Sequence, residues 1–336
     1  MSATYVRVTE GFTRGGNTVN NTTFELIESF KRDKDGLYIT VDGSGIAGFR
    51  AGRNRVYVES ESCVETVGAT VVEVAVEKSD AEIARDLSDT FEILGEMTQA
   101  VVNSVVRGLV VSGPAGIGKS FTVEKTLVDN FGHYEIDADN RMYEVVSGFI
   151  TAAMLYEKLW NFRNDGQVLV FDDCDSVLYD EDALNIIKAA LDTKKIRCIS
   201  WSSRSRYLED NGIPNRFEFC GGIIFITNIK FDQLRSARIG NHLEAIMSRC
   251  HYMDIGVDTP REKVIHIKNT VEKGRMLDQY GFNTVEKKEL LGYITTNHSQ
   301  LRELSLRMVL KIADLKKAMP SNWVKFVEKN CHKRAS

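Results

Sequence analysis

The chain has 336 residues, of which 43% are apolar and 27% are charged, and its net charge at neutral pH is -4. This composition excludes a disordered or fibrous chain and predicts a globular protein, with one large domain and appendages or with two to three smaller domains. No window approaches the run of about 18 apolar residues that a membrane span needs, and the N-terminus lacks the apolar core of a signal peptide. Neither export nor membrane anchoring is therefore expected.

The six cysteines are widely spaced and match neither a zinc-site pattern nor a disulfide framework, which predicts reduced thiols and a cytoplasmic protein. The charge is uneven, because residues 259–336 carry 16 Lys and Arg against 8 Asp and Glu, a local charge of +8. A basic end of this kind fits a nucleic acid, an acidic partner or an ordinary solvated helical face.

Residues 1–78 are predicted to form a small β-rich domain. Runs such as "GLYITVDGSG", "RNRVYVES" and "TVVEVAVE" alternate polar and apolar residues between glycines, as half-buried strands do. The stretch "GSGIAG", Gly43 to Gly48, fits the dinucleotide-binding pattern, but a strand-like run follows it where that pattern needs a helix. A hairpin turn is therefore preferred there to a cofactor site.

From Ser79 the periodicity becomes helical, with Ser79 or Asp80 as the candidate N-cap and Gly108 as the closing glycine. Apolar runs then alternate with helical ones as far as residue 258, which predicts a parallel β-sheet covered by helices on both faces. Beyond Thr259 only helical periodicity remains. The predicted fold class is α/β, with domains at 1–78 (β-rich), 79–258 (α/β core) and 259–336 (helical lid).

The stretch "GPAGIGKS" satisfies the phosphate-loop pattern G-x-x-x-x-G-K-[ST] and lies between an apolar strand and a helix. Its glycines let backbone N–H groups surround a phosphate at the helix N-terminus, Lys119 reaches the β- and γ-phosphates, and Ser120 ligates Mg²⁺. The predicted nucleotide-binding residues are Gly113, Pro114, Ala115, Gly116, Ile117, Gly118, Lys119, Ser120 and Phe121.

Three carboxylates follow the apolar run in "QVLVFDDCDSVL". In a phosphate-loop fold the strand that ends in an acid supplies a magnesium ligand, so Asp172 is assigned to the metal together with Ser120. Asp173 is then placed to polarise the water that attacks the γ-phosphate. Asp175 is assigned as a helix cap or a structural acid.

Together these motifs resemble those of the AAA+ ATPases, over about Asp80 to Arg307. "GPAGIGKS" resembles Walker A and "VLVFDD" resembles Walker B, while "GGIIFITN" resembles the sensor-1 strand, which implies that Asn228 orients the attacking water. "HLEAIMSRC" resembles the end of the helix that carries the arginine finger, which makes Arg249 the candidate, with Arg235 and Arg238 as rivals. "SQLREL" resembles sensor 2, which implies Arg302, with Arg307 as the competing residue.

The resemblance implies an ATPase that uses ATP and Mg²⁺. The finger residue of this family acts on the nucleotide of a neighbouring subunit, so a homo-oligomer is implied, expected to be a hexameric ring.

One departure from the family pattern bears on the rate of ATP hydrolysis. The family usually has Asp-Glu at Walker B, whereas this chain has Asp172-Asp173, and the shorter side chain ends about 1.5 Å short of the glutamate position.

Residues 193–222 form a long connection before the sensor-1 strand, in which "IRCISW" and "NRFEF" alternate like the strands of a hairpin. The resemblance extends here to unfoldases and ring helicases, whose pore-facing hairpins would correspond to a tip with Arg204, Arg206 and Tyr207. An exposed polar loop is the other reading. Phe149, between a strand and a helix, is expected in the core rather than in a pore.

The leading functional hypothesis is an AAA+ ATPase that remodels or translocates a macromolecule, protein or nucleic acid, and does not act on a membrane. Its general form is similar to that of small ATPases of bacteriophages. Two alternatives remain: an ATP-dependent loader or switch that acts on DNA replication machinery, and a nucleotide-stabilised scaffold with little turnover.

Overall fold

The computed structural model describes residues 4–14, 18–44, 46, 49, 52–67, 78–132, 141–230 and 237–334, with the side chains of 237–241 left out. The chain divides into two compact units, Met1–Glu77 and Lys78–Ser336. The boundary expected between the α/β core and the lid falls inside the second unit. Each unit is described separately.

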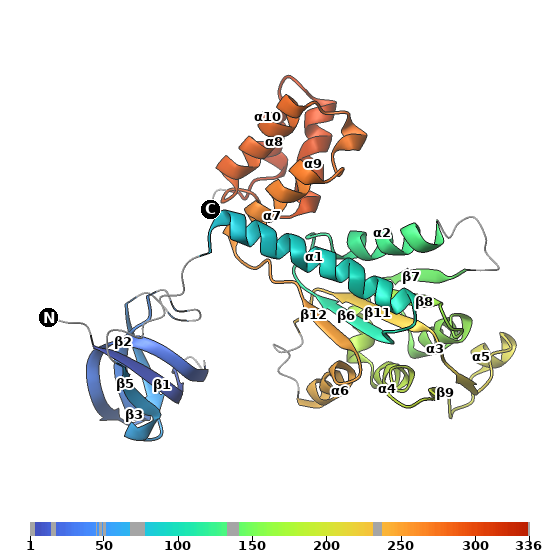
Figure 1. Ribbon diagram of the computed structural model, residues 1–336, viewed down its shortest axis with the longest axis horizontal. Helices are drawn as coiled ribbons and strands as arrows, with labels where there is room; N and C mark the ends of the chain where they lie inside the picture. Colours follow the sequence, from blue (N-terminus) through green and yellow to red (C-terminus); the bar gives the residue numbers. More distant parts are fainter. Residues whose placement is uncertain are drawn as a thin grey trace. The chain divides into compact units, whose positions relative to one another are not determined.

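The first unit is built from antiparallel strands (Figure 1). Strand β1 pairs with β2, β4 and β5, and β3 lies between β2 and β4, so that β1 to β4 close on themselves. Alternate residues, such as Val6 and Val8 of β1, point into a small apolar core. The strands are β1 Tyr5–Phe12, β2 Thr18–Asp33, β3 Gly36–Asp42, β4 Arg53–Val58 and β5 Val64–Val67, with a 3₁₀ turn at Glu61–Cys63.

The predicted turn at Gly43–Gly48 lies between β3 and β4. The N–H groups of Ser44 and Gly52 both donate to Asp42 Oδ1, and Gly43 N donates to the carbonyl oxygen of Gly52. No helix begins at the described residues of this stretch, which agrees with a turn. Gly45, Ala47 and Gly48 lie outside the described residues, as does the strand expected at 70–77.

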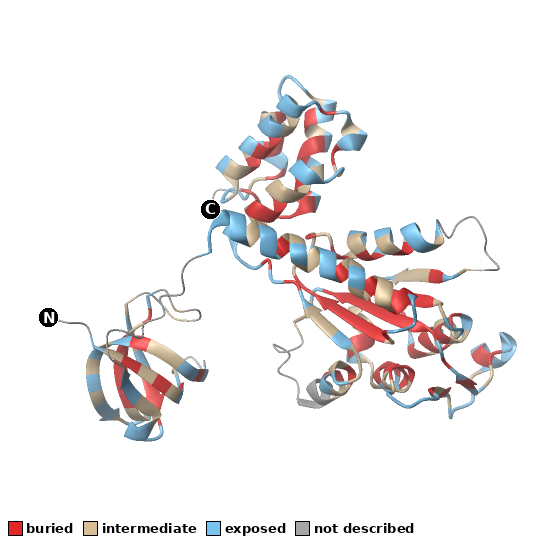
Figure 2. Cartoon of the chain, viewed as in Figure 1, coloured by how far each residue is buried: buried red, intermediate tan, exposed pale blue. Residues whose placement is uncertain are grey.

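The second unit contains the predicted parallel sheet, which is confirmed (Figure 1). Its strand order is β12-β6-β11-β8-β7, and every neighbouring pair is parallel. The central strands are buried on both faces, as their continuous apolar runs predict (Figure 2). The strands are β6 Gly108–Ser112, β7 Tyr143–Ser147, β8 Val168–Asp172, β11 Gly222–Thr227 and β12 His251–Asp254.

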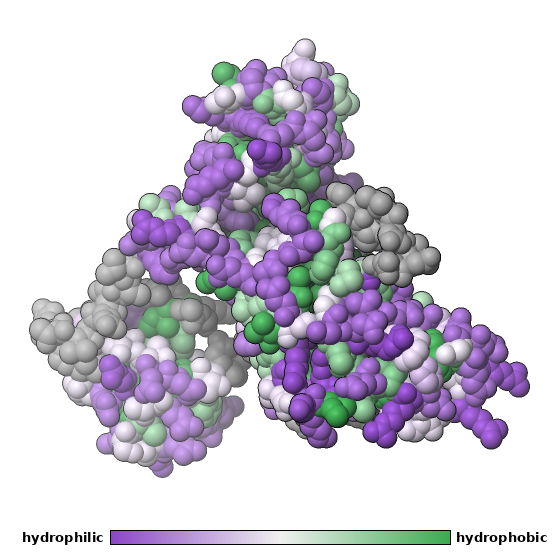
Figure 3. Space-filling model, turned by 45° about the vertical axis from the view of Figure 1, so that its right-hand side comes forward, coloured by the Kyte–Doolittle hydropathy of each residue, from purple (hydrophilic) through white to green (hydrophobic). Residues whose placement is uncertain are grey.

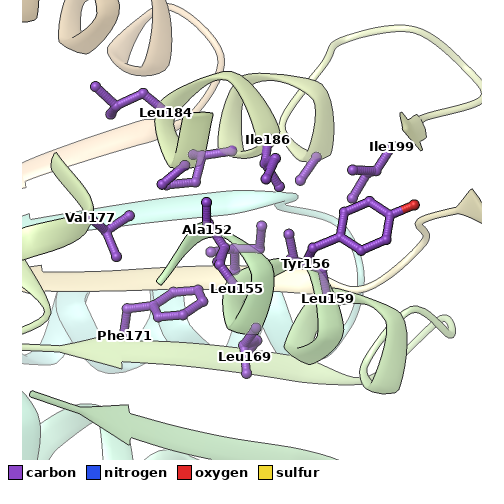
Figure 4. Packing of buried hydrophobic residues seen from close by; sticks show 14 of the residues in the cluster. Ala152, Leu155, Tyr156, Leu159, Leu169, Phe171, Val177, Leu184, Ile186 and Ile199 are labelled. Carbon is purple, nitrogen blue, oxygen red and sulfur yellow. The ribbon is translucent and has the colours of Figure 1, made fainter. Parts of the chain in front are cut away.

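Two apolar clusters lie on opposite faces of this sheet, because successive side chains of a strand point to opposite sides. Leu169 and Phe171 of β8 belong to one cluster, with apolar residues of α3 and α4 (Figure 4). Apolar residues of α6 belong to the same cluster. Val168 and Val170 belong to the other, with residues of α1 and α2. The covering helices are α1 Asp80–Val102, α2 Lys119–Phe131, α3 Ala152–Asn161, α4 Glu181–Ala190 and α6 Ala237–Met247.

Helix α1 begins as predicted. The Ser79 side chain accepts from Glu82 N, and the Glu82 carboxylate accepts from Ser79 N, which forms a capping box. The predicted end at Gly108 is wrong. The helix stops at Val102, the chain turns at Ser104 with a φ of 57°, and Gly108 is the first residue of β6.

The predicted pair of strands before β11 is present. Strand β9, Cys198–Ser200, pairs antiparallel with β10, Arg216–Glu218, and a short helix α5, Arg206–Asp210, lies between them. The buried guanidinium of Arg197 donates to the carbonyl oxygens of Ala190 and Gly221, 2.9 and 3.1 Å away. This residue therefore joins the two ends of the segment between α4 and β11 to each other.

The C-terminal helices of the second unit surround an apolar core of their own. They are α7 Pro260–Lys273, α8 Thr284–Asn297, α9 Leu306–Ala318 and α10 Trp323–Asn330. A 3₁₀ turn at Asp278–Tyr280 lies between α7 and α8, and another at Asp175–Tyr179 follows β8. Figure 3 shows their surface, at the top of the view, as mostly hydrophilic. Among the described helices, none has the length and apolar content needed to cross a bilayer.

The chain before β11 packs too closely for a side chain at Gly221. A Cβ added there would lie 2.3 Å from the carbonyl oxygen of Phe162, whereas one at Gly292, exposed on α8, would meet nothing within 4 Å. We expect Gly221→Ala to lower the free energy of unfolding by about 1–3 kcal/mol, and Gly292→Ala to raise it by about 0.5–1 kcal/mol. Urea denaturation followed by tryptophan fluorescence measures both, and an unchanged midpoint for Gly221→Ala would contradict the packing described.

Candidate active site

A glycine-rich loop, Gly113–Gly118, connects β6 to the start of α2 at Lys119. Gly113, Gly116 and Gly118 have φ angles of 153°, 71° and 103°, which other residues rarely adopt. A Cβ at Gly116 would also lie 2.9 Å from Cβ of Ser305. Glycine at this position is therefore required both by the turn and by the close approach of the lid.

The ammonium group of Lys119 lies at the centre of the site. Its Nζ donates to the carbonyl oxygens of Gly113 and Pro114, at 2.7 and 2.9 Å, and to Asn228 Oδ1, at 2.9 Å. The residue is 5% exposed. Burial lowers the pKa of Lys119 to about 8, although the nearby carboxylates of Asp173 and Asp172 act in the opposite direction.

The strand order explains how Asn228 comes to this position. Strand β11 lies between β6, which leads into the loop, and β8, which ends at Asp172, so the carboxyl ends of the three strands meet at one edge. Asn228 directly follows β11. Its Oδ1 accepts from Lys119 while its Nδ2 donates to Asp173 Oδ1 at 2.8 Å, so one amide joins the lysine to the second acid.

Asp173 has a left-handed backbone, with a φ of 52°. Its N–H donates to the carbonyl oxygen of Ile226 on β11. Such a conformation costs about 1–2 kcal/mol for a residue other than glycine, less for aspartate than for most. It turns the chain out of β8 and lets the carboxylate of Asp173 contact Asn228.

Ser120 and Asp172 form the pair assigned to the metal. A hydrogen bond with the Ser120 hydroxyl stabilises the Asp172 carboxylate, but burial has the larger effect and raises the pKa of Asp172. A half-buried carboxylate and a hydroxyl are oxygen donors of the kind that Mg²⁺ prefers, and a cation would offset the cost of burying the charge. The two side chains therefore fit a magnesium ion that is also held by phosphate and water.

A cavity of about 510 Å³ opens beside the loop and is large enough for a nucleotide. It lies between the loop, the ends of β8 and β11, and the lid. Apart from Arg307, the sequence did not predict the lid side chains on its wall, because no local motif marks them. The lining residues are Gly116, Gly118, Lys119, Ser120, Phe121, Asp172, Asp173, Asn228, Thr270, Gly274, Arg275, Met276, Gln279, Leu306, Arg307 and Leu310.

The structure favours Arg307 over Arg302 as the lid arginine near the site. Arg307 lines the cavity, and its charge acts on the pKa values of Lys119 and Asp172. Arg302 precedes helix α9 and is not among the lining residues. Its Nε donates instead to the carbonyl oxygen of His332, at 2.9 Å.

Arg249 lies between the end of α6 at Met247 and the start of β12 at His251. It does not line the cavity of its own chain. Its Nη1 donates to the carbonyl oxygen of Ala245 at 2.5 Å. The two rival residues cannot be compared with it, because Arg235 and the side chain of Arg238 lie outside the described part of the chain.

Asp175, assigned as a helix cap or a structural acid, accepts a hydrogen bond from the buried Thr227.

The expectation for Phe149 is wrong. The side chain is 79% exposed, because Gly148, with a φ of 90°, turns the chain outward between β7 and α3. In the chain between β9 and β10, which holds the tip residues named from the sequence, Arg204 and Arg206 are exposed. The hydroxyl of Tyr207 is hydrogen-bonded to Glu157 of α3.

No protein-family model matches the sequence. The chain is 34% identical over 305 residues to a protein of Enterobacteria phage T4 described as "Uncharacterized 36.7 kDa protein in nrdC-mobD intergenic region". The match covers 90% of each chain. The chain therefore belongs to the same family as this phage protein.

Solved structures with similar folds include the replication initiator DnaA bound to AMPPCP and single-stranded DNA (TM-score 0.41, 15% identity). NtrX from Brucella abortus in complex with ATP is another (TM-score 0.40, 13% identity). The matches cover 71% and 70% of this chain. The chain spans 63% of the DnaA chain and 49% of the NtrX chain.

The lowered pKa of Lys119 predicts proton uptake when a polyphosphate binds. Near pH 9 the free lysine is mostly neutral, and the negative charge of a bound triphosphate would raise its pKa and restore the proton. Well below pH 8 the lysine is already charged, so uptake should become small. Affinity should therefore fall as the pH rises above the pKa of Lys119, about 8.

Calorimetric titration with Mg-ATP in two buffers of different ionisation enthalpy measures this uptake at pH 7 and pH 9. We expect close to one proton at pH 9 and almost none at pH 7. Lys119→Arg keeps its charge at both pH values, so its weaker binding should show no uptake. Equal uptake by the wild type at both pH values would contradict the assignment.

Proposed function

We propose that this member of the phage T4 36.7 kDa protein family binds Mg-ATP and hydrolyses it. The observation that carries the proposal is the connected set of side chains at one sheet edge, in which Asn228 bonds both Lys119 and Asp173 beside the Ser120–Asp172 pair. A loop rich in N–H groups, a lysine, and a hydroxyl with a carboxylate are together the chemistry that a magnesium-bound triphosphate needs.

In this proposal each residue has one task. Lys119 exchanges its present carbonyl and amide acceptors for β- and γ-phosphate oxygens. Ser120 and Asp172 would hold the magnesium ion, which neutralises charge on the phosphates when it is bound. Asp173 takes a proton from the attacking water, and Asn228 fixes the direction of the Asp173 carboxylate.

The proposed class is an AAA+ ATPase working as a homo-oligomeric ring, expected to be hexameric. The order of the motifs along the chain and the position of the Asn228 strand between the loop strand and the Asp172 strand support this class. Arg249 would act on the nucleotide of a neighbouring subunit, and Arg307, rather than Arg302, would contact phosphate from the lid. The substrate would be a macromolecule, and the six free cysteines agree with work in the cytoplasm.

One observation favours a role on DNA as the second candidate. Lys325 and Lys329 of α10 are exposed, and neither forms an ion pair within the described residues. They belong to the region with a local charge of +8, which suits a phosphate backbone. Strong stimulation of ATP turnover by single-stranded DNA would favour a nucleic-acid machine or loader, and indifference would favour remodelling of a protein.

The first experiment substitutes Asp173→Asn. The amide keeps the size of the carboxylate but cannot accept a proton, so ATP turnover should fall by about 10²–10⁴-fold while ATP binding persists. Steady-state phosphate release and calorimetric binding measure the two quantities. An unchanged rate would refute Asp173 as the base, and a wild-type protein that turns over no ATP while binding it would favour the scaffold alternative.

The second experiment mixes Arg249→Ala with Lys119→Ala subunits. Each variant alone should be inactive, because one lacks the finger and the other lacks the lysine at every interface. In an equal mixture about a quarter of interfaces combine an intact Lys119 with an intact Arg249 of the neighbour, so about a quarter of wild-type turnover should return. No recovery at any mixing ratio would contradict action between subunits.

A further inference from the structure

A buried histidine of the lid is bonded to the backbone of the glycine-rich loop. His266, on α7, is 6% exposed, and its Nε2 lies 2.7 Å from the carbonyl oxygen of Ile117. Because a carbonyl can only accept, the imidazole donates through Nε2–H. The ring is stacked on Phe91 of α1, with centroids 4.9 Å apart and an interplanar angle of 13°, which fixes its plane.

The preceding carbonyl of the loop has a partner from the lid as well. The N–H of Leu306, the first residue of α9, donates to the carbonyl oxygen of Gly116 at 2.8 Å. Ser305, which caps α9, lies directly against Gly116. Two consecutive peptide groups of the loop are thus held from their carbonyl side by two different lid helices.

A planar trans peptide points its N–H opposite to its C=O. The chain has no cis peptide bond among its described residues. The Ile117 carbonyl shares its peptide with Gly118 N–H, and the Gly116 carbonyl shares its peptide with Ile117 N–H, so both N–H groups point away from the lid donors. In the described part of the chain neither N–H group has a protein acceptor, and Gly116 and Gly118 line the cavity.

We propose that His266 is a positioning residue for phosphate recognition, because it holds the Ile117 carbonyl and so orients the Gly118 N–H toward the bound phosphates. The Leu306 N–H holds the Gly116 carbonyl and orients the Ile117 N–H in the same way. This inference rests on the proposed nucleotide site and adds to it a contribution from the lid. A hydrogen bond at the carbonyl also polarises the N–H of the same peptide, which strengthens its bond to an anion. Lid and loop would then be coupled, because a lid that moves away releases both peptide groups.

Substitution of His266 separates this role from simple packing. His266→Phe keeps an aromatic ring against Phe91 but has no donor, and His266→Gln has an N–H donor at a similar reach. We expect His266→Phe to weaken ATP and ADP binding about tenfold, the value of one hydrogen bond. Adenosine, which has no phosphate, should bind within about twofold of wild type, and His266→Gln should recover most of the ATP affinity.

Calorimetry measures the affinities for ATP and ADP, and an NMR titration measures that for adenosine, with thermal unfolding of each variant as a control for folding. Equal ATP affinity of His266→Phe and wild type would overturn the inference. So would a loss for adenosine as large as the loss for ATP, because that would indicate general damage to the cavity. If wild type binds no ATP, the proposed function itself fails, which is a different result.

A second variant covers the case in which His266→Phe does not fold. Leu306 is the first residue of α9, a position where proline is tolerated, so Leu306→Pro removes the N–H donor to Gly116 with little cost to the helix. Leu306→Ala is the matched control, because it also loses the leucine side chain but keeps the N–H. Leu306→Pro should bind ATP more weakly than Leu306→Ala by several-fold, and equal affinities would contradict the role assigned to the lid donors.

Discussion

The second unit buries an ammonium group, that of Lys119, at the edge where the carboxyl ends of three strands of its sheet meet. Lys119 is held by two loop carbonyls and by Asn228, and these acceptors replace part of the water that burial removes. Burial still dominates, as the lowered pKa of Lys119 indicates. The nearby carboxylates of Asp173 and Asp172 offset this effect only in part, so an anion in contact with the lysine would raise its pKa.

The sheet order turns this local chemistry into a connected site. Because β11 is inserted between β6 and β8, the polar residues at the ends of three strands come together although they are far apart in the sequence. The buried strands hold these ends rigidly, with an apolar cluster on each face of the sheet. The lid adds backbone contacts to the loop, so the same loop is shaped from both sides by different parts of one unit.

Local patterns were sufficient to predict the parallel sheet, the loop and the two acids, since each has its own sequence signal: apolar runs, glycine spacing and carboxylates at a strand end. They could not predict residues whose position depends on where an element starts. Helix α9 begins at Leu306, which leaves Arg302 outside it and brings Arg307 to the cavity. Phe149 was assigned by its apolar character, but the turn at Gly148 exposes it. His266 has no signal at all, because its partner is a backbone carbonyl 149 residues away.

The segment between α4 and β11 starts and ends at one place, where Arg197 bonds the carbonyl oxygens of Ala190 and Gly221. Between these two bonds Ile199, Leu208 and Phe217 pack into the apolar cluster that also contains residues of α3 and α4. The segment is therefore part of this core, and any change in its length would have to preserve that packing.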